Sequence, residues 1–281
     1  MTKKLSKKNN SILIWLCLIV ATITGASLGL YENVSNSGLL GNYKPNVSEQ
    51  IERLFTPAKE VKVPILVYHY VEYVKDSNDI IRKSLSTTPL VLENQIKTLL
   101  ENGYELISFK RLDQYLEGIK PLPKKSVILT FDDGYEDFYT DVLPILKKYK
   151  VNATQYLVSG FVGKRNYMNE FQVKEIIKSG LVEIGAHTVS HDNLKLSPDN
   201  IAIQEIEQSK KDIEKKYNIS VTTFAYPYGD YNERTPGIVK RAGFKTAVTV
   251  EDGFIISANE RFTLFRIHPG IDVGSDLLKK L

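Results

Sequence analysis

Short runs of β-branched and aromatic residues alternate with longer amphipathic segments from Val63 onward. The short runs have the length of buried strands, and the longer segments show the spacing of helices that cover a sheet. The expected strands are Pro64–Tyr68, Tyr104–Ile107, Ser126–Thr130, Ala153–Val158, Val182–Ala186, Thr222–Ala225, Thr246–Val250 and Thr263–Ile267. The expected helices between them are Pro89–Asn102, Phe138–Lys148, Asn169–Ser179, Pro198–Tyr217 and Asn232–Ala242.

This alternation predicts an α/β fold with a parallel sheet and helical crossovers. The number of strands favours an irregular (β/α) barrel of about seven to eight parallel strands. An open doubly wound sheet is the alternative. The first strand is not followed by a glycine-rich phosphate loop, so a nucleotide-binding version of either fold has little support.

The N-terminus has a different pattern. Lys3, Lys4, Lys7 and Lys8 precede an uncharged stretch that is most apolar at Ile12–Ile23. Positive residues before an apolar run are typical of an export signal, with the lysines on the cytoplasmic side. We therefore expect a signal or membrane helix over residues 1–32, a linker or stalk over residues 33–62, and a catalytic domain over residues 63–281.

These boundaries place the catalytic domain outside the cytoplasm, at the cell membrane or secreted if the N-terminal segment is cleaved. The formal net charge is +4, and the four N-terminal lysines account for it, so nucleic-acid binding is not indicated. The single cysteine, Cys17, excludes an internal disulfide and a cysteine-based zinc cluster.

The four histidines all fall beside the ends of predicted strands. His69 follows the first strand, His187 and His191 follow the fifth, and His268 follows the last. In a barrel of parallel strands, the loops at the carboxyl ends form the active site. The histidines are therefore candidates for a shared site.

Asp132 and Asp133 follow the third predicted strand, within the segment Thr130–Gly134 (TFDDG). One interpretation is a simple turn, because Asp and Gly are both common where strands end. The other is that one carboxylate binds a metal while its neighbour acts as a base. A divalent cation would relieve the repulsion between the two carboxylates and keep both ionised.

His187 and His191 are four residues apart, so a helical turn between them would direct both rings to one ion. The alternative is two unrelated loop histidines. Two histidines and one carboxylate form a normal set of three ligands for a catalytic zinc site that keeps a position open for water. After the sixth strand, the turn in Ala225–Gly229 (AYPYG) can direct a backbone N–H at a developing oxyanion. Tyr226 and Tyr228 in this turn are also candidates for stacking on sugar rings.

In their order and separation, TFDDG, HTVSH (His187–His191) and AYPYG resemble the motifs of the carbohydrate esterase family 4 polysaccharide deacetylases, which carry the NodB homology domain. The resemblance covers the chain from about Val63 to the C-terminus. It implies a metal-dependent hydrolase that removes acetyl groups from an N-acetylated sugar polymer.

The resemblance also implies a role for each matching residue. Asp132 is similar to the catalytic base, and Asp133, His187 and His191 are similar to the metal ligands. Tyr228 is similar to the residue whose backbone N–H stabilises the oxyanion. The implied metal is zinc, with cobalt, nickel or iron as alternatives.

The chain departs from the family's commonest form in two places. Ala225 stands where many members have an arginine that supports the base, and the late segment Leu264–His268 is out of register with the usual Leu-x-His. Both departures, together with the early segment Leu66–Val71 (LVYHYV), are similar to the branch of biofilm poly-N-acetylglucosamine deacetylases, in which the acid histidine comes from the first strand, before the TFDDG segment. By that analogy His69 is the general acid, His268 is the second candidate, and Arg266 replaces the missing arginine.

We also include Tyr226, Arg266 and His268 among the expected substrate-binding residues. The expected substrate is poly-β-1,6-N-acetylglucosamine. The alternatives are a peptidoglycan N-acetylglucosamine deacetylase and, from another class, a catalytically silent sugar-binding protein of the cell surface. The sequence leaves the oligomeric state open.

Overall fold

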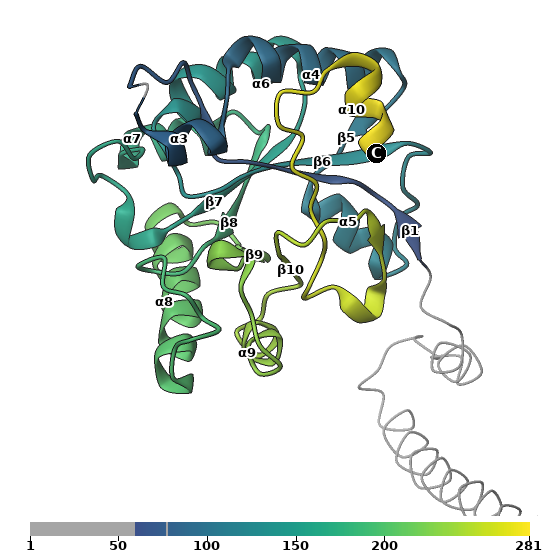
Figure 1. Ribbon diagram of the computed structural model, residues 1–281. Helices are drawn as coiled ribbons and strands as arrows, with labels where there is room; N and C mark the ends of the chain where they lie inside the picture. The colour runs from purple at the N-terminus through teal and green to yellow at the C-terminus, as the bar shows by residue number, and fades with distance from the viewer. Residues whose placement is uncertain (1–59, 77) are drawn as a thin grey trace, which may run out of the picture. The chain divides into compact units, whose positions relative to one another are not determined.

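The computed structural model describes residues 60–281 except residue 77 (Figure 1). Its central sheet has seven strands, β2 (Ile65–Tyr68), β5 (Glu105–Leu106), β6 (Ser126–Phe131), β7 (Ala153–Leu157), β8 (Val182–Ala186), β9 (Thr223–Ala225) and β10 (Thr246–Val248). The spatial order is β10-β9-β8-β7-β6-β2, and β5 pairs with the start of β6. All neighbours are parallel, so the predicted parallel α/β fold is confirmed.

The predicted eighth strand, Thr263–Ile267, is wrong as a continuous strand. Leu264 forms a single parallel bridge with Val248 in β10, and Ile267 forms another with Leu66 in β2. The segment therefore lies between the two edge strands of the curved sheet. It changes partner within three residues, so it cannot form a longer ladder with either strand.

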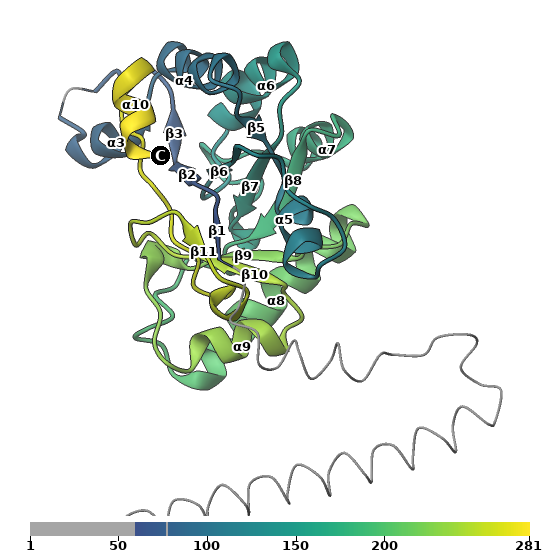
Figure 2. The ribbon, with the colours of Figure 1, turned by 90° about the vertical axis from the view of Figure 1, so that its right-hand side faces the viewer.

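Helices cover the outside of the curved sheet (Figures 1 and 2). The principal ones are α4 (Pro89–Glu101), α5 (Phe109–Leu116), α6 (Leu143–Tyr149), α7 (Glu170–Lys178), α8 (Asp199–Tyr217) and α9 (Thr235–Arg241). The sequence predicted five of these six. It did not predict α5, which has only eight residues. Two further helices, α3 (Ile80–Leu85) and α10 (Gly274–Lys280), were not predicted either.

The strands are buried on both faces because alternate residues enter two apolar clusters. Leu66 and Leu129 belong to the larger cluster, which includes the buried faces of the helices. Ile65 and Ile128, one position earlier on the same strands, belong to the smaller one. This two-residue alternation is the one that a parallel sheet covered by helices requires.

Gly185 in β8 makes room for a large aromatic side chain in the smaller cluster. A Cβ atom at Gly185 would lie 2.3 Å from the ring of Tyr156, which is fully buried. The Tyr156 hydroxyl lies 2.8 Å from the Thr223 hydroxyl of β9. The Tyr156 ring therefore packs directly against the backbone of Gly185 in this part of the interior.

Two short pairs of strands lie outside the central sheet. β1 (Val61–Lys62) is antiparallel to β11 (Ile255–Ile256), and β3 (Tyr70–Val71) is parallel to β4 (Ser86–Thr87). The residues of β1 fall at the end of the predicted stalk. The predicted membrane segment, and the stalk up to residue 59, lie outside the described residues. Within the described part of the chain, none of the helices combines the length and apolar character needed to span a bilayer.

Candidate active site

The carboxyl ends of the parallel strands meet at one end of the sheet, where most of the residues selected from the sequence lie. Asp132 and Asp133 directly follow β6, and His187 directly follows β8. His69 follows β2, and Tyr228 lies in the turn after β9. The topology therefore brings together residues that are up to about 160 positions apart in the sequence.

Asp133 and two histidines form a compact group. Asp133 Oδ1 lies 3.4 Å from His187 Nε2 and 3.3 Å from His191 Nε2. Asp133 Oδ1 is buried and has no hydrogen-bond partner among the described residues. One ligand atom from each of the three side chains lies within 4.8 Å of the others.

This group fits a metal ion. In a tetrahedral zinc site with bonds of about 2.0–2.1 Å, neighbouring ligand atoms are about 3.4 Å apart. The two distances from Asp133 Oδ1 agree with that separation. The unpartnered carboxylate oxygen and the two imidazole nitrogens that it faces are also three ligand atoms that a divalent cation can bind.

His187 is held in the orientation that metal binding needs. Its Nδ1 lies 2.8 Å from the carbonyl oxygen of Ala225, to which it donates, so Nε2 carries the free lone pair. The side chain is buried beneath the site. The backbone of Ala225, at the end of β9, thus fixes a ring at the end of β8.

The loop between the two histidines is not helical, which corrects the expected helical turn. Thr188 and His191 instead adopt positive φ angles of 64° and 61°. Such a conformation costs an ordinary residue about 1–2 kcal/mol. The Glu205 carboxylate stabilises the loop by accepting hydrogen bonds from the backbone N–H groups of Val189 and Ser190 at 2.8 and 2.9 Å.

The two adjacent aspartates point to different partners. Asp133 has a φ of 73°, a left-handed backbone conformation directly after β6. Asp132 accepts two hydrogen bonds from the Arg266 guanidinium, at 2.8 and 2.7 Å, and both side chains are almost completely buried. Burial by itself raises the pKa of Asp132, but Arg266 outweighs it and holds the pKa below its usual value. Asp132 is therefore an ionised carboxylate beside the candidate metal site.

Arg266 is fixed by two further groups. Its Nε donates to the carbonyl of Thr249 at 2.6 Å, and Nη1 donates to the Thr130 hydroxyl at 3.2 Å. Only 1% of the residue is exposed, so the expected direct contact with substrate is wrong. The geometry instead agrees with the expectation that Arg266 replaces the arginine absent at Ala225.

The structure separates the two histidines considered for general acid. His69 Nε2 lies 3.9 Å from Asp132 Oδ2, and the side chain is 18% exposed. Burial lowers the pKa of His69, although Asp132 and Asp133 act in the opposite direction. His268 is exposed, and burial of part of its ring and the charge of His69 lower its pKa. His69 is thus the histidine in contact with Asp132.

The two tyrosines of the turn after β9 differ from each other. Tyr226 is fully buried and donates its hydroxyl to the carbonyl of Phe262 at 3.0 Å, so stacking on a sugar ring is excluded. Tyr228 is 61% exposed, and its ring centre lies 4.7 Å from that of His191. Its φ of 60° and ψ of 5° place it in the left-handed region. Of these two tyrosines, Tyr228 is the one that a ligand at this site can contact.

Stacked tyrosines beside Asp133 were not predicted. The ring centres of Tyr70 and Tyr135 are 3.9 Å apart, and those of Tyr135 and Tyr167 are 5.0 Å apart. The Arg82 guanidinium covers Tyr70 at 4.3 Å. Tyr70 directly follows His69, and Tyr135 directly follows the TFDDG segment. This adjacency to candidate site residues was the signal in the sequence that could have identified them.

Comparisons with known proteins show the family to which the chain belongs. A family model described as polysaccharide deacetylase matches residues 119–247. Poly-beta-1,6-N-acetyl-D-glucosamine N-deacetylase of Staphylococcus aureus (strain MRSA252) is 31% identical over 227 residues, covering 75% of this chain and 77% of the relative. The chain belongs to the polysaccharide deacetylase family and is an amide hydrolase.

Two solved structures are similar as well. The Streptococcus pyogenes deacetylase PplD, in complex with acetate, has 32% identity and a TM-score of 0.71, covering 80% of this chain and 99% of that one. IcaB from Ammonifex degensii has 24% identity and a TM-score of 0.66, covering 78% and 94%, and shows similarity of fold. The matched residues 119–247 include Asp132, Asp133, His187 and His191 but neither His69 nor Arg266.

Proposed function

We propose that the chain is a zinc-dependent N-deacetylase of poly-β-1,6-N-acetylglucosamine. The observation that carries the proposal is that two adjacent carboxylates have different neighbours. Asp133 faces two histidine nitrogens without a hydrogen-bond partner of its own, whereas Asp132 is held by Arg266. One carboxylate is thus available to a cation and the other to a proton.

In this proposal the protein's own residues position and move protons. Asp133, His187 and His191 would hold a divalent cation, which would supply Lewis-acid polarisation of the acetyl carbonyl and of the attacking water. Asp132 removes a proton from that water, and Arg266 keeps the Asp132 carboxylate ionised and oriented.

The remaining groups complete the hydrolysis. The backbone N–H of Tyr228 donates to the oxyanion as the carbonyl becomes tetrahedral. His69 gives a proton to the departing amine, so the C–N bond breaks and acetate is released. The contact between His69 and Asp132 supports His69 for this role over the exposed His268.

The proposed substrate is supported by two features. The Staphylococcus aureus relative is named for poly-β-1,6-N-acetylglucosamine, and its identity to this chain extends over three quarters of both proteins. His69, the histidine that contacts Asp132, follows β2, which corresponds to the first predicted strand, as in the branch that the sequence resembles. We further propose that the N-terminal apolar stretch after the lysines anchors the enzyme in the cell membrane, with its catalytic domain facing outward.

Acetate release by the purified full chain tests the proposal. The zinc-loaded protein would receive β-1,6- and β-1,4-linked N-acetylglucosamine oligomers in parallel. We expect turnover of the β-1,6 oligomer, and a decrease of about 10²- to 10⁴-fold for Asp132→Asn and for His69→Ala. Asp276→Asn, at an exposed ion pair of α10, is the matched control.

Other outcomes would lead to different conclusions. Turnover only of β-1,4 oligomers or peptidoglycan fragments would indicate that the substrate is peptidoglycan of the cell wall and not the β-1,6-linked polymer. A loss of activity in His268→Ala but not in His69→Ala would exchange the two histidines. An absence of acetate from every substrate would contradict the proposed reaction.

A further inference from the structure

The two histidines of the candidate metal site are held in different ways. The His187 side chain is 2% exposed, and a hydrogen bond from its Nδ1 to the Ala225 carbonyl fixes the ring. The His191 side chain is 21% exposed. Among the described residues, the His191 ring makes no hydrogen bond to a carbonyl oxygen of the kind that fixes His187. The place of the His191 ring therefore depends on the backbone of the loop that carries it.

The Glu205 carboxylate of α8 binds this loop through three hydrogen bonds. Its Oε2 accepts from the backbone N–H groups of Val189 and Ser190 at 2.8 and 2.9 Å, and its Oε1 accepts from the Ser190 hydroxyl at 2.6 Å. The Glu205 residue is only 9% exposed, and all three donors are neutral. Burying a charge costs free energy unless it is paired, so packing alone gives no reason for an acid at this position.

The carbonyl groups of the same loop have a different partner, the segment η2 (Ser159–Phe161) that follows β7. The N–H of Ser159 donates to the carbonyl of Thr188, and the N–H of Gly160 donates to the carbonyl of Val189, both at 3.0 Å. A Cβ atom at Gly160 would lie 2.6 Å from the Val189 oxygen, so only glycine allows this close approach. The loop is thus held through its N–H groups by α8 and through its carbonyl groups by η2.

These hydrogen bonds stabilise a backbone that is unfavourable by itself. Thr188 and His191 have φ angles of 64° and 61°, in the left-handed region that residues other than glycine rarely adopt. Without Glu205, two N–H groups of the loop would lose their acceptor, and the loop would be free to relax towards ordinary φ angles. That relaxation would move the His191 ring away from Asp133 Oδ1, which it now approaches at 3.3 Å. Glu205 therefore acts on the metal site through the loop and without touching the ion.

We propose that Glu205 is a positioning residue that sets the affinity and the coordination geometry of the metal site. The proposal rests on the proposed function, because it requires that Asp133, His187 and His191 bind a divalent cation. Glu205 lies on α8, outside the motifs that the sequence analysis selected. Its two oxygens accept from three donors at once, so the loop is already in place before an ion arrives.

The zinc affinity of the purified full chain, measured by competition with a chelator, tests this proposal without any turnover. Glu205→Ala removes all three hydrogen bonds and should weaken zinc binding about 10- to 100-fold, the range found for residues that orient metal ligands. Glu205→Gln should restore part of the affinity. Its amide oxygen can accept from the two backbone N–H groups, and its NH₂ group can donate to the Ser190 hydroxyl.

A spectroscopic signal reports the geometry of the site. In the cobalt-loaded protein, the visible d–d absorption should change in Glu205→Ala and return towards that of the wild type in Glu205→Gln. Ser190→Ala removes only the hydrogen bond to Oε1 and should weaken zinc binding by a smaller factor than Glu205→Ala. This variant keeps the proposal testable even if Glu205→Ala does not fold.

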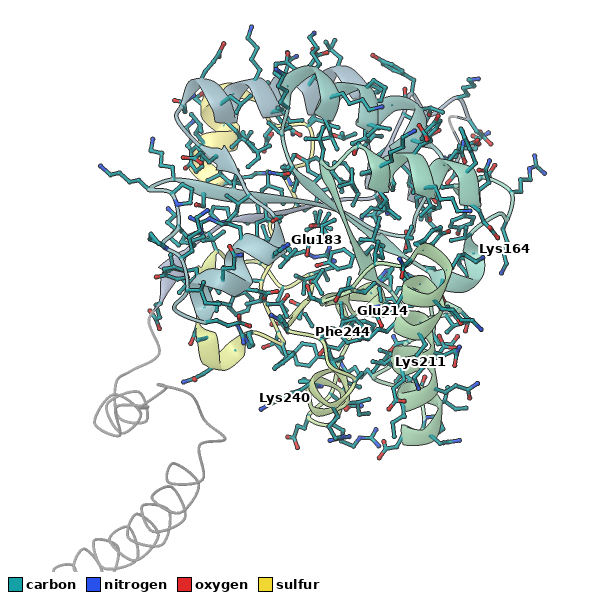
Figure 3. The ribbon with its side chains drawn as sticks, turned by 180° about the vertical axis from the view of Figure 1, so that it is seen from behind. Lys164, Glu183, Lys211, Glu214, Lys240 and Phe244 are labelled. Atoms are coloured by element: carbon teal, nitrogen blue, oxygen red, sulfur yellow. The ribbon has the colours of Figure 1, made fainter. Side chains whose placement is uncertain are left out.

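Two controls separate positioning from a general loss of stability. Glu207→Ala removes a more exposed carboxylate of the same helix, whose partner at 2.9 Å is Lys211, labelled on α8 in Figure 3. Leu99→Ala removes a fully buried side chain near the end of α4 and lowers the stability of the fold without touching the loop. Both variants should bind zinc like the wild type.

The possible outcomes distinguish this proposal from the proposed function. Unchanged zinc affinity in Glu205→Ala and Ser190→Ala, or an equal loss of affinity in Leu99→Ala, would overturn the positioning role. A wild-type chain that binds no divalent cation would overturn the positioning role and the proposed function together. A chain whose zinc affinity depends on Glu205 but which releases no acetate would contradict the proposed reaction alone.

Discussion

Replacing Arg266 by Met removes the cation that holds Asp132 and leaves a similar apolar length in its place. Arg266 is 1% exposed and Asp132 is 2% exposed, so water cannot take over the lost hydrogen bonds. The variant also leaves the Thr249 carbonyl and the Thr130 hydroxyl without their guanidinium donor. The structure therefore predicts a loss of stability as well as a loss of activity.

The expected magnitude follows from the burial of the pair. Breaking a buried ion pair by removing one partner costs about 3–5 kcal/mol, because the remaining charge stays uncompensated. That is a large part of the total of about 5–15 kcal/mol that stabilises a typical domain. Arg266→Lys keeps the charge but loses the two parallel hydrogen bonds, and we expect an intermediate loss.

The assay is urea unfolding followed by circular dichroism, with acetate release measured on the same samples. Arg266→Met, Asp132→Asn and the double variant form a thermodynamic cycle. We expect the double variant to lose less free energy of unfolding than the two single variants together, since it removes both charges. The difference should be about 2 kcal/mol or more. Its activity should stay as low as that of Asp132→Asn, because the base is absent.

The control replaces an arginine of an exposed pair. Arg234 pairs with Asp199, and both side chains are more than half exposed, so Arg234→Met should cost at most about 1 kcal/mol. If Arg266→Met costs no more than this control, or if the two single losses simply add, the argument from the buried pair is wrong.

Further predictions concern the metal, the pH dependence and the packing of the sheet. His191→Ala should lower the zinc content of the purified chain well below one ion per molecule by mass spectrometry, and an unchanged content would contradict the ligand assignment. Burial and the charge of a neighbouring carboxylate raise the pKa of Asp113 to about 7 from the usual 3.8. The folded state therefore keeps a proton that the unfolded state has lost, and stability falls as the pH rises from about 4 to 7. Asp113→Asn should remove this fall, making the variant more stable than the wild type at pH 8 by up to about 4 kcal/mol, and an equal difference at pH 4 would refute the reasoning. Gly185→Ala should destabilise the fold by about 1–3 kcal/mol in urea unfolding because its Cβ would meet the Tyr156 ring. Gly237→Ala in α9, where the nearest atom would be 3.5 Å away, should not destabilise it, and equal losses would argue against the close contact as the cause.

The regular elements were largely predictable because they depend on local periodicity. The segments Ser126–Thr130 and Val182–Ala186 are short, mainly apolar runs with β-branched residues, and both became central strands. Thr263–Ile267 has a similar composition but forms only two bridges. The sequence pattern indicates that such a segment is buried, but not over how many residues it pairs with one neighbouring strand.

Parts of the site were also visible in the sequence. Asp132, Asp133, His187 and His191 lie directly after strands or within a short loop, so their common location followed from the parallel order of the strands. The burial of Tyr226 did not follow, because Tyr226 and Tyr228 are two positions apart in a turn rather than in a regular strand. The backbone of that turn decides which of the two rings faces solvent.

By itself the sequence determined the class of fold, the family and the three side chains that face one another at the candidate metal site. These features depend on periodicity within one element or on motifs of about five residues. The family resemblance suggested that Arg266 supports Asp132 and that His69 is preferred to His268, but only the tertiary structure shows the two hydrogen bonds of Arg266 to Asp132, 134 positions away, and the approach of His69 to Asp132. It also shows that the Asp113 carboxylate is buried without a hydrogen-bond partner among the described residues. Such contacts depend on register, side-chain direction and the closing of the sheet, and no local pattern along the chain records them.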